Sequence, residues 1–289
     1  MQQSFDFAEP NQPAQAPRVE PISLGAGRVL VGTCGYSYKD WIGPFYPERT
    51  KPGEMLPFYA RRFSAVEIDS TYYRIPSSAT FASMAKRTPP DFRFSVKVPG
   101  SLTHVVAQAQ GVTDDARLFR ENLAPLVQSG KLAAALMQFP QSFRPSTSSE
   151  AYLRELREAL PGISLVAEFR SREWQRAQTL DLLAELQIAW CNVDEPQFAG
   201  LLRPSSDVVG PLGYVRLHGR NYKKWFRGDA AERYEYSYSV EELAPWTARV
   251  ADIAAQACQT YVFFNNHRFG QAAGNAQTFA RMLLAQTSV

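Results

Sequence analysis

The amino-acid sequence predicts an α/β fold of the (β/α)8, TIM-barrel-like type, with an irregular sixth unit and a disordered N-terminal tail. Short apolar segments alternate with longer segments of helical periodicity, and stretches rich in Ser, Pro and Gly separate them. The alternating units fill roughly 260 residues, which is the usual size of such a barrel. An open doubly wound sheet has the same local alternation and remains the alternative.

Residues 1–27 are expected to form the tail, because a stretch rich in Gln, Pro and Ala carries too little apolar surface to offset the entropy cost of ordering. Residues 28–289 are expected to form a single barrel domain. Its predicted strands are Arg28–Thr33, Ala65–Asp69, Arg93–Lys97, Leu132–Phe139, Ile163–Phe169, Ile188–Val193, Gly213–His218 and Thr260–Asn265. Its predicted helices are Gly53–Phe63, Ser77–Arg87, Thr113–Gln128, Ser149–Leu160, Gln175–Leu186, Val240–Ala257 and Gly270–Leu284.

The sixth unit departs from this pattern. After Val193 the chain continues Asp-Glu-Pro-Gln-Phe-Ala-Gly and then reaches Pro204 and Pro211, which is not typical of a regular helix. Two further segments, Thr103–Gln110 and Asn221–Tyr238, are predicted to be long loops, and such loops are uncommon unless they are functional. The second loop is rich in aromatic residues. This favours packing on the barrel rim, although its alternating tyrosines also fit a small hairpin.

Composition limits the possible functions only broadly. Hydrophobic residues make up 45% of the chain and charged residues 20%, as in a globular protein with a core, and the net charge of +3 gives no global argument for nucleic acid or membrane. Three cysteines without metal-ligand spacing argue against a disulfide framework or structural zinc, and for a reducing compartment. No segment approaches the roughly 20 apolar residues of a membrane helix. The N-terminus lacks the pattern of a secretory signal, so a cytoplasmic location is expected.

Five predicted strands carry ionisable, hydroxyl or amide side chains on the face opposite their apolar residues. These side chains are Glu67 and Asp69, Ser95 and Lys97, Glu168 and Arg170, Arg216 and His218, and Asn265. In a barrel this face points inward, and its last residues reach the C-terminal mouth where active sites lie. Burying one unpaired charge costs several kcal/mol, roughly, so these groups must be paired with each other or hydrated.

A purely structural explanation of this polar face also stands. Glu67 or Glu168 could pair with Arg170, Arg216 or Lys97 in an ion-pair network that closes the barrel. The sequence does not distinguish this network from a binding site.

A series of short motifs follows the strands in a fixed order. They are Val31–Trp41, Phe45–Pro47, Val66–Tyr73, Phe94–Pro99 with Thr103 and His104, Gln138–Pro140, Val166–Arg170 with Trp174, Tyr214–Arg220, and Phe263–His267 with Asn275 and Ala276. In these motifs the sequence resembles the YecE-like family, also called domain of unknown function 72, over nearly everything after the tail. The resemblance implies a TIM-barrel-like fold. It implies no reaction, because the family has no settled activity.

Three positions depart from the pattern expected of that family. Cys34 and Tyr36 stand where Ser and Trp are expected, and Asp69 stands where Asn is common. These differences argue against Cys34 as a nucleophile.

Four residues are candidates for catalysis. Glu67 and Glu168, on opposite sides of the predicted mouth, suit acid/base chemistry such as a glycosidase uses. His218 can act as base, acid or metal ligand near neutral pH. Lys97 can form a Schiff base or act as a base, although a cation that holds a phosphate or carboxylate is the preferred interpretation.

The remaining candidates are predicted to bind substrate. Arginine forks suit anionic oxygens, amides suit hydroxyl groups, and aromatic rings can form walls for a sugar or base ring. The predicted substrate-binding residues are Asp69, Thr71, Tyr72, His104, Gln138, Arg170, Trp174, Arg216, Arg220, Asn265, Asn266 and Asn275.

The cofactor requirement is not resolved by the sequence. The three histidines, His104, His218 and His267, all lie near predicted strand ends, and with nearby carboxylates they could ligate a divalent metal. No short ligand motif supports this site, and no motif for an organic cofactor is present.

The sequence therefore predicts an enzyme acting on a small anionic, hydroxylated substrate, such as a sugar phosphate or glycoside, in a pocket at the barrel mouth. Hydrolase, lyase and isomerase chemistry all remain open. The alternatives are a protein that binds or processes nucleic acid, using the same arginines and aromatic residues, and a non-catalytic binding module. No membrane partner is expected, and the oligomeric state is not predicted.

Overall fold

The computed structural model describes residues 17–104, 112–228 and 230–286. Eight parallel strands form a closed ring in which each strand pairs with the next and the last pairs with the first. They are β2 (Gly27–Cys34), β3 (Ala65–Ile68), β4 (Arg93–Lys97), β5 (Leu132–Gln138), β6 (Leu165–Glu168), β7 (Ile188–Asp194), β8 (Leu212–Leu217) and β9 (Gln259–Phe264). The β2–β9 pairing excludes an open sheet and confirms the predicted (β/α)8 fold.

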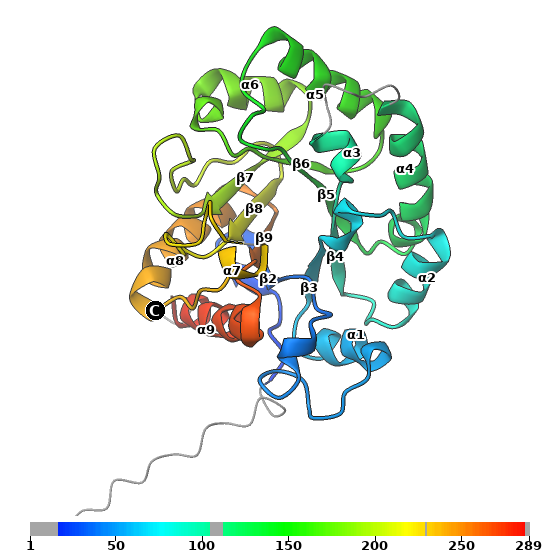
Figure 1. Cartoon of the computed structure of the whole chain (residues 1–289), viewed down its shortest axis with the longest axis vertical. Helices are drawn as coiled ribbons and strands as arrows, with labels where there is room; N and C mark the ends of the chain where they lie inside the picture. The colour runs from blue at the N-terminus through cyan, green and yellow to red at the C-terminus, as the bar shows by residue number, and fades with distance from the viewer. Residues whose placement is uncertain (1–16, 105–111, 229, 287–289) are drawn as a thin grey trace, which may run out of the picture.

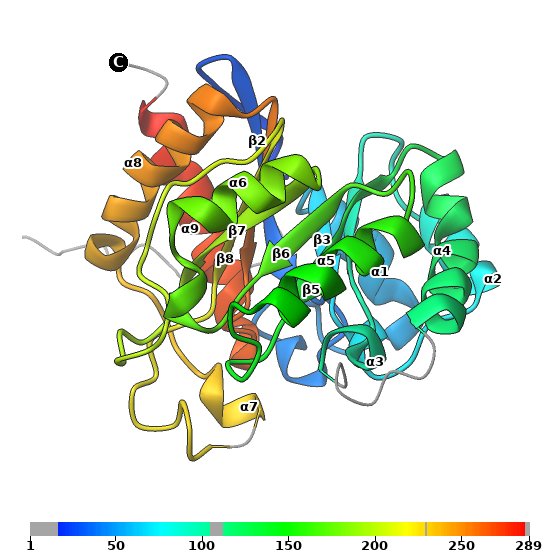
Figure 2. The ribbon, with the colours of Figure 1, turned by 90° about the horizontal axis from the view of Figure 1, so that it is seen from above.

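The helices surround this ring (Figure 1). The longer ones are α1 (Pro52–Ala60), α2 (Ser78–Lys86), α4 (Val112–Gln128), α5 (Thr147–Ala159), α6 (Ala177–Glu185), α8 (Val240–Gln256) and α9 (Gln271–Gln286). Shorter turns follow the strands: η2 (Lys39–Trp41), η3 (Ser70–Tyr72), α3 (Gly100–Thr103), η5 (Arg172–Trp174), α7 (Ala230–Arg233) and η6 (Arg268–Gly270). Figure 2 shows α3 and α7 at one end of the barrel, which is the C-terminal end of the strands.

Serine residues fix where several helices begin. The Ser77 hydroxyl accepts the backbone N–H of Thr80 at the start of α2. At α8 the Ser239 hydroxyl and the Glu242 carboxylate each accept the other's backbone N–H, which forms a capping box. Between β7 and β8, residues 195–211 contain no helix, as the prolines of the sixth unit predict. Among the helices of the described ranges, none is long and apolar enough to cross a membrane.

The predicted tail is too long at its C-terminal end. Ile22–Leu24 form strand β1, which pairs antiparallel with β2, and Val19 pairs with Phe63. Ile22 is buried, and β1 packs near α8 and α9. Alternating apolar residues therefore give this short segment enough buried surface to fold, despite its polar surroundings in the sequence. Residues 1–16 lie outside the described part of the chain.

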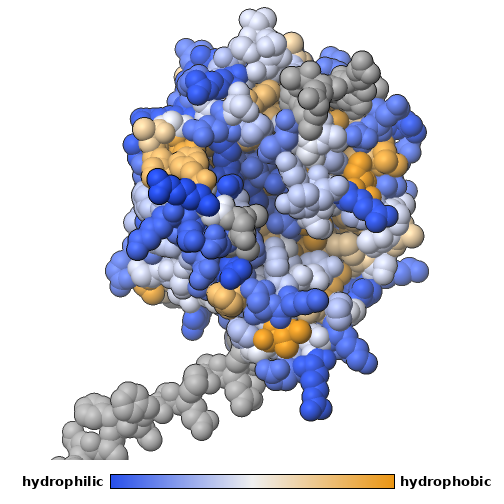
Figure 3. All heavy atoms as spheres, in the orientation of Figure 1, coloured by the Kyte–Doolittle hydropathy of each residue, from blue (hydrophilic) through white to orange (hydrophobic). Residues whose placement is uncertain are grey.

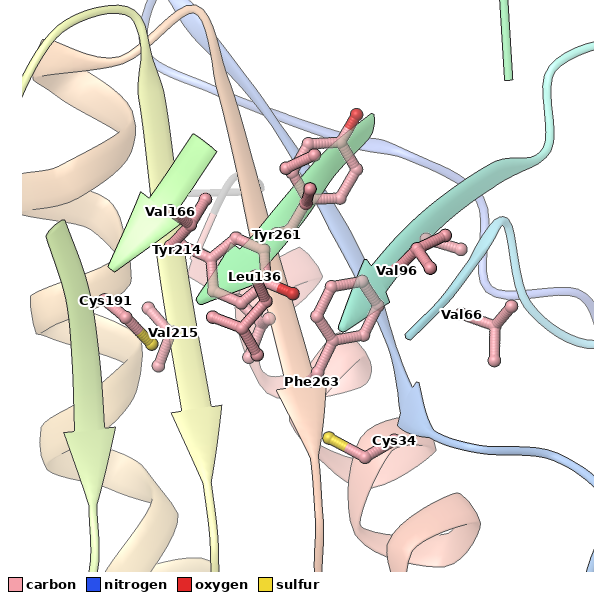
Figure 4. Close-up of a cluster of buried hydrophobic side chains, with 14 of the residues drawn as sticks. Cys34, Val66, Val96, Leu136, Val166, Cys191, Tyr214, Val215, Tyr261 and Phe263 are labelled. Carbon is pink, nitrogen blue, oxygen red and sulfur yellow. The ribbon is translucent and has the colours of Figure 1, made fainter. Parts of the chain in front are cut away.

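Large side chains fill the barrel interior beneath the mouth. Tyr214, Tyr261 and Phe263 lie together in the buried cluster of Figure 4, with Leu136 and Val166 beside them. The ring centroids of Tyr214 and Phe263 are 5.5 Å apart. The barrel is therefore a packed core rather than a pore, so any small-molecule site must lie above this layer at the C-terminal mouth.

Candidate functional site

Arg216 is the centre of a buried ion cluster that lies directly above the packed layer. From β8 its NH2 donates to Glu67 Oε1 on β3 at 2.7 Å, and its NH1 donates to Glu168 Oε2 on β6. The hydroxyl of Tyr214 donates to the other oxygen of Glu67 at 2.6 Å. Neither carboxylate has any exposed surface. One guanidinium therefore joins three strands across the barrel interior.

Arg170 extends this cluster toward the mouth. Its Nε lies 2.9 Å from Glu168 Oε1, its NH1 donates to Glu195 at 2.7 Å, and its guanidinium lies 5.6 Å from the ring centre of Trp225. Burial alone would raise the pKa of Glu168, but Arg216 and Arg170 hold that pKa well below its usual range. Glu168 is therefore an ionised carboxylate at neutral pH.

His218 completes the buried ion cluster, defined as Glu67, Glu168, Arg170, Arg216 and His218. Its Nε2 lies 3.1 Å from Glu168 Oε1, and its Nδ1 lies 3.0 Å from the amide nitrogen of Asn265. Nε2 also lies 3.2 Å from the guanidinium of Arg170, which can only donate, so Nε2 is shared between a donor and the Glu168 carboxylate. Burial, with the nearby charge of Arg170, lowers the pKa of His218 to about 3. The ring is therefore neutral, and both of its nitrogens are engaged.

These contacts differ from the predicted role of the two acids. Glu67 and Glu168 do not face each other across an open pocket; they share one guanidinium in the interior. Lys97 has no ion pair with Glu67. The structural network that the sequence left open is therefore present, and it accounts for most of the polar face that the sequence predicted.

A second group of polar side chains lies above the buried ion cluster and reaches solvent. This mouth group consists of Asp69, Lys97, His104, Gln138 and His267, all of which are partly exposed. Viewed onto the mouth, the surface of the barrel has a central hollow with hydrophilic residues around it (Figure 3). The mouth group is therefore the part of the polar face that a small molecule can reach.

Lys97 is the cation of the mouth group. Its Nζ lies 4.6 Å from the ring centre of Tyr72, and within the described ranges it makes no hydrogen bond or ion pair. Burial and then the charge of Arg216 lower its pKa to about 8, although Glu168 and Asp69 act in the opposite direction. Lys97 is thus a mostly protonated amine without a carboxylate partner.

His104 lies beside Lys97. Its ring meets that of Tyr72 edge-on at 4.9 Å, and its Nδ1 lies 3.0 Å from the hydroxyl of Thr103. Burial, then the charges of Lys97 and Arg170, lower its pKa to about 4. The imidazole is neutral at pH 7 and can accept or relay a proton.

His267 follows β9 and Asp69 follows β3, the two strands that flank β2 in the ring. His267 stacks on Tyr38 with ring centres 4.7 Å apart, and its Nδ1 lies 3.2 Å from the carbonyl of Asn265, to which it can donate. Burial lowers the pKa of His267, so the ring is neutral at pH 7, and within the described residues its Nε2 makes no hydrogen bond. The Asp69 carboxylate makes no hydrogen bond within the part of the chain that the structure describes. Its negative charge acts to raise the pKa of Lys97 and of His267, against the effect of burial.

Two aromatic side chains from the loop between β8 and α8 cover the buried ion cluster. The rings of Trp225 and Tyr234 meet edge-on at 6.1 Å and lie 6.4 and 6.0 Å from His218. The loop begins at Gly219, whose φ of +88° brings it against Tyr236, where a Cβ would lie 2.7 Å from the Tyr236 Cβ. It contains α7 rather than a hairpin. The many aromatic residues of this loop were visible in the sequence, but the sequence did not predict which of the rings face the mouth.

Glu195 is a site residue that the sequence did not single out. It follows β7 directly, accepts from Arg170 through Oε2, and its buried Oε1 has no hydrogen-bond partner among the described residues. Burial raises its pKa to about 7; Glu168 adds to this effect and Arg170 opposes it. The Asp-Glu pair at a strand end was its only signal in the sequence.

Several predicted substrate-binding residues lie outside the mouth. Trp174 is fully buried on the outer side of the barrel, stacked on Phe169 and Phe143 with ring centres 4.4 and 5.5 Å away. Arg220 forms a two-pronged ion pair with Asp194, which also accepts from Trp246 on α8. Both were plausible because they follow strand ends, but the turns after β6 and β8 direct them to these partners rather than to the mouth.

Three other predicted substrate-binding residues hydrogen-bond to the backbone near the mouth. Asn275 donates to the carbonyl of Tyr238 and accepts its N–H, and Asn266 donates to Asn275 and to the carbonyl of Tyr236. The Thr71 hydroxyl donates to the carbonyl of Lys97 at 2.5 Å. The asparagines thus fix the aromatic loop, and Thr71 fixes the end of β4.

A metal site was left open by the sequence. Among the residues the structure describes, no group of three or more His, Cys, Asp or Glu side chains is arranged to hold a metal ion. The thiol of Cys34 lies 3.5 Å from Arg216 NH2, and burial, followed by Glu67, raises its pKa well above the usual range, so it is not a thiolate.

The fold and site together define a (β/α)8 barrel with a charge-paired interior and an open polar mouth. A family model described as "Protein of unknown function DUF72" matches residues 30–289. The chain therefore belongs to the DUF72 family, as the motifs predicted.

Relatives of this family cover most of the chain. The UPF0759 protein YunF of Bacillus subtilis (strain 168) is 30% identical over 273 residues, which are 88% of this chain and 94% of that protein. The crystal structure of a DUF72 family protein from Thermotoga maritima is 41% identical, with a TM-score of 0.83, over 89% of this chain and 99% of that one. A DUF72 family protein from Enterococcus faecalis is 30% identical, with a TM-score of 0.79, over 89% and 95% of the two chains. These likenesses support the barrel fold across the whole matched region.

Proposed function

We propose that this protein is an enzyme that acts on a small, hydroxylated, anionic substrate, such as a sugar phosphate, bound at the barrel mouth. The observation that carries the proposal is the state of Lys97. It is a mostly protonated amine at the mouth with no carboxylate partner within the described ranges, whereas Arg170 and Arg216 are ion-paired. A ligand anion would supply the partner that the protein does not.

Proton transfer is assigned to the mouth group rather than to the buried ion cluster. His104 and His267 are neutral and partly exposed, and Asp69 has no hydrogen bond within the described residues. By contrast, both nitrogens of His218 are engaged. General acid or base catalysis needs a group that can reach the substrate, so these three residues suit it better than Glu67, Glu168 and His218.

The surroundings of Lys97 suit a hydroxylated compound. Tyr72 on one side and Trp225 with Tyr234 on the other present ring faces and edges to the mouth. The side-chain amide of Gln138, at the end of β5, is partly exposed and has no hydrogen bond within the described ranges. An amide between aromatic walls is a common arrangement for binding sugar hydroxyl groups.

The test is equilibrium binding of a panel of phosphosugars by calorimetry to the wild type, to Lys97→Met and to Lys39→Met. Lys39 is exposed on η2 at the same end of the barrel and serves as the matched control. We expect Lys97→Met to weaken binding at least about tenfold, or roughly 1.4 kcal/mol, and Lys39→Met to change little. The proposal fails if the wild type binds no member, or if the Lys97 variant binds as well as the wild type.

A second candidate function is binding of single-stranded nucleic acid. Tyr222 and Phe226 on the rim are 50% and 59% exposed, and each is followed in the chain by an exposed cation, Lys223 and Arg227. Aromatic rings beside cations are typical of surfaces on which bases stack. A gel shift with short RNA and DNA at low salt tests it. Retention that is lost on Tyr222→Ala and Phe226→Ala supports it, and no retention by the wild type excludes it.

A further inference from the structure

Among the described residues, two lysines are buried or partly buried, one at the end of β4 and one just before β5, and their surroundings differ. Lys131, just before β5, is 6% exposed, and its Nζ donates to the carbonyls of Ala85 and Thr88 and to the Thr88 hydroxyl at 2.6, 2.7 and 3.0 Å. Lys97, at the end of β4, has none of these acceptors. An ammonium group has three donors, so Lys131 is satisfied and Lys97 is not.

The unsatisfied amine is also held in position. The Thr71 hydroxyl binds the carbonyl of Lys97. The Tyr72 ring beneath Nζ is held between His104 and the backbone of Gly100, where a Cβ would lie only 2.8 Å from the ring. Tyr72 can offer the ammonium form a ring face but no lone pair. A positioned amine that lacks acceptors loses its proton more readily than an ordinary lysine, which agrees with its pKa of about 8.

We propose that Lys97 is a nucleophile that forms an imine with a carbonyl group next to the substrate's anionic group, so that the substrates are small hydroxylated 2-oxo acids, of which simple 2-oxo acids are the minimal analogues. This inference deepens the proposed function and rests on it. It names the class of substrate and the bond that forms at the same mouth.

Each step of this reaction balances without a co-reactant. The neutral Lys97 Nζ adds to the carbonyl carbon, and the carbonyl oxygen takes up a proton to give a carbinolamine. Loss of that hydroxyl as water then gives the imine, and addition of one water molecule reverses the step and releases the carbonyl compound from Lys97. The neutral imidazole of His104 is the neighbouring group that can take the proton from Nζ and return it to the departing hydroxyl.

The position of the anion favours 2-oxo acids. A carboxylate attached directly to the carbonyl carbon pairs with protonated Lys97 on arrival, which brings the carbonyl within reach of the same nitrogen. After condensation the protonated imine carries the positive charge, so the carboxylate keeps a cation beside it. Arg170 and Arg216 already have carboxylate partners, which makes Lys97 the cation for this role within the described residues.

The experiment is reductive trapping on the full chain. The protein is incubated separately with pyruvate, 2-oxobutyrate and dihydroxyacetone phosphate, and sodium borohydride is added. Intact mass and peptide mapping then locate the adduct. We expect one reduced adduct per chain on the peptide that contains Lys97. We expect none in Lys97→Arg and an unchanged adduct in Lys39→Arg, with both variants checked for folding by circular dichroism.

No adduct with any of the three probes, or adducts spread over exposed lysines such as Lys39 and Lys223, would overturn the imine proposal. Binding of 6-phosphogluconate, which has no ketone or aldehyde, separates this failure from a failure of the proposed function. If its binding depends on Lys97 while trapping fails, only the imine is lost. If its binding does not depend on Lys97 and trapping fails as well, the role of Lys97 at the mouth is lost with it.

Discussion

The buried ion cluster and the mouth group are neighbours on the same strands, but the charges of the first are paired and buried, whereas those of the second are unpaired and partly exposed. In the interior, Glu67, Glu168 and Arg216 share short contacts and have essentially no exposed surface. A few ångströms further along β3 and β4, Asp69 and Lys97 are partly exposed and have no ion pair within the described ranges. Glu67, whose charge is paired, and Asp69, whose charge is not, are therefore only two residues apart along the chain.

Because of this difference, the interior charges are expected to contribute to stability and the mouth charges to ligand binding. A paired charge in the interior contributes to stability only while all its partners are present, because removal of one leaves the others buried and unpaired. An unpaired charge at the mouth contributes little to stability and is available to a ligand. Substitutions in the two groups should therefore differ in the property they change.

The largest expected effect is in the interior. Arg216→Met removes the cation shared by Glu67 and Glu168, and we expect it to lower the free energy of unfolding by about 3–5 kcal/mol in urea denaturation. The matched control is Arg154→Met, which breaks the exposed ion pair between Arg154 and Glu185 and should cost about 1 kcal/mol or less. Equal losses in the two variants would contradict the central role of Arg216.

A smaller effect, dependent on pH, is expected at Glu195. Because burial raises its pKa to about 7 in the folded protein, above its value in the unfolded chain, folding binds a proton between these two values. The stabilisation from protonated Glu195 is complete below the unfolded pKa and is lost as pH rises toward 7. Glu195→Gln stays neutral, so its stability relative to the wild type should rise over this window, by up to about 3 kcal/mol.

Thermal or urea unfolding of both proteins from pH 4.5 to 7.5 measures this difference. Glu185→Gln, on the outer surface, is the control for general effects of removing a carboxylate. A difference between the Glu195 variant and the wild type that stays flat with pH would show that Glu195 is fully ionised by its contact with Arg170.

The smallest expected effect on stability is at the mouth. Lys97→Met keeps the apolar stem of the side chain and removes a partly buried charge without acceptors, so we expect the free energy of unfolding to change by less than about 0.5 kcal/mol. Urea denaturation of the same preparation used for ligand binding checks this. A loss above about 2 kcal/mol would mean that Lys97 has a structural partner, and the contrast between the two groups would no longer hold.

The sequence predicted the barrel well because strand and helix periodicities are local properties. The strand ranges and the inward position of Glu67, Glu168 and Arg216 follow from alternation, and the irregular segment after β7 follows from its prolines. Alternation cannot say which carboxylate an arginine contacts, because Glu67 and Arg216 are 149 residues apart in the chain. It also could not place Trp225 and Tyr234, since their positions depend on a loop held by Asn266 and Asn275.

The positions of Trp174 and β1 were also not predictable from local sequence. Trp174 follows a strand end, as active-site residues of barrels often do, but the turn after β6 directs it to the outer aromatic stack. The β1 segment is three residues long, which is too short for a periodicity to stand out from a Pro- and Gln-rich context. In both cases tertiary packing decided what local sequence left open.

The barrel closes only when its last strand pairs with its first, and this has a consequence for synthesis on the ribosome. Glu67 and Glu168 leave the exit tunnel well before β8 delivers Arg216, and β9 seals the ring later still. A nascent chain that ends before β8 therefore has Glu67 without its counter-ion and Glu168 with only Arg170, so Glu67 must remain hydrated. Formation of the native interior is thereby delayed until nearly the whole chain has been made.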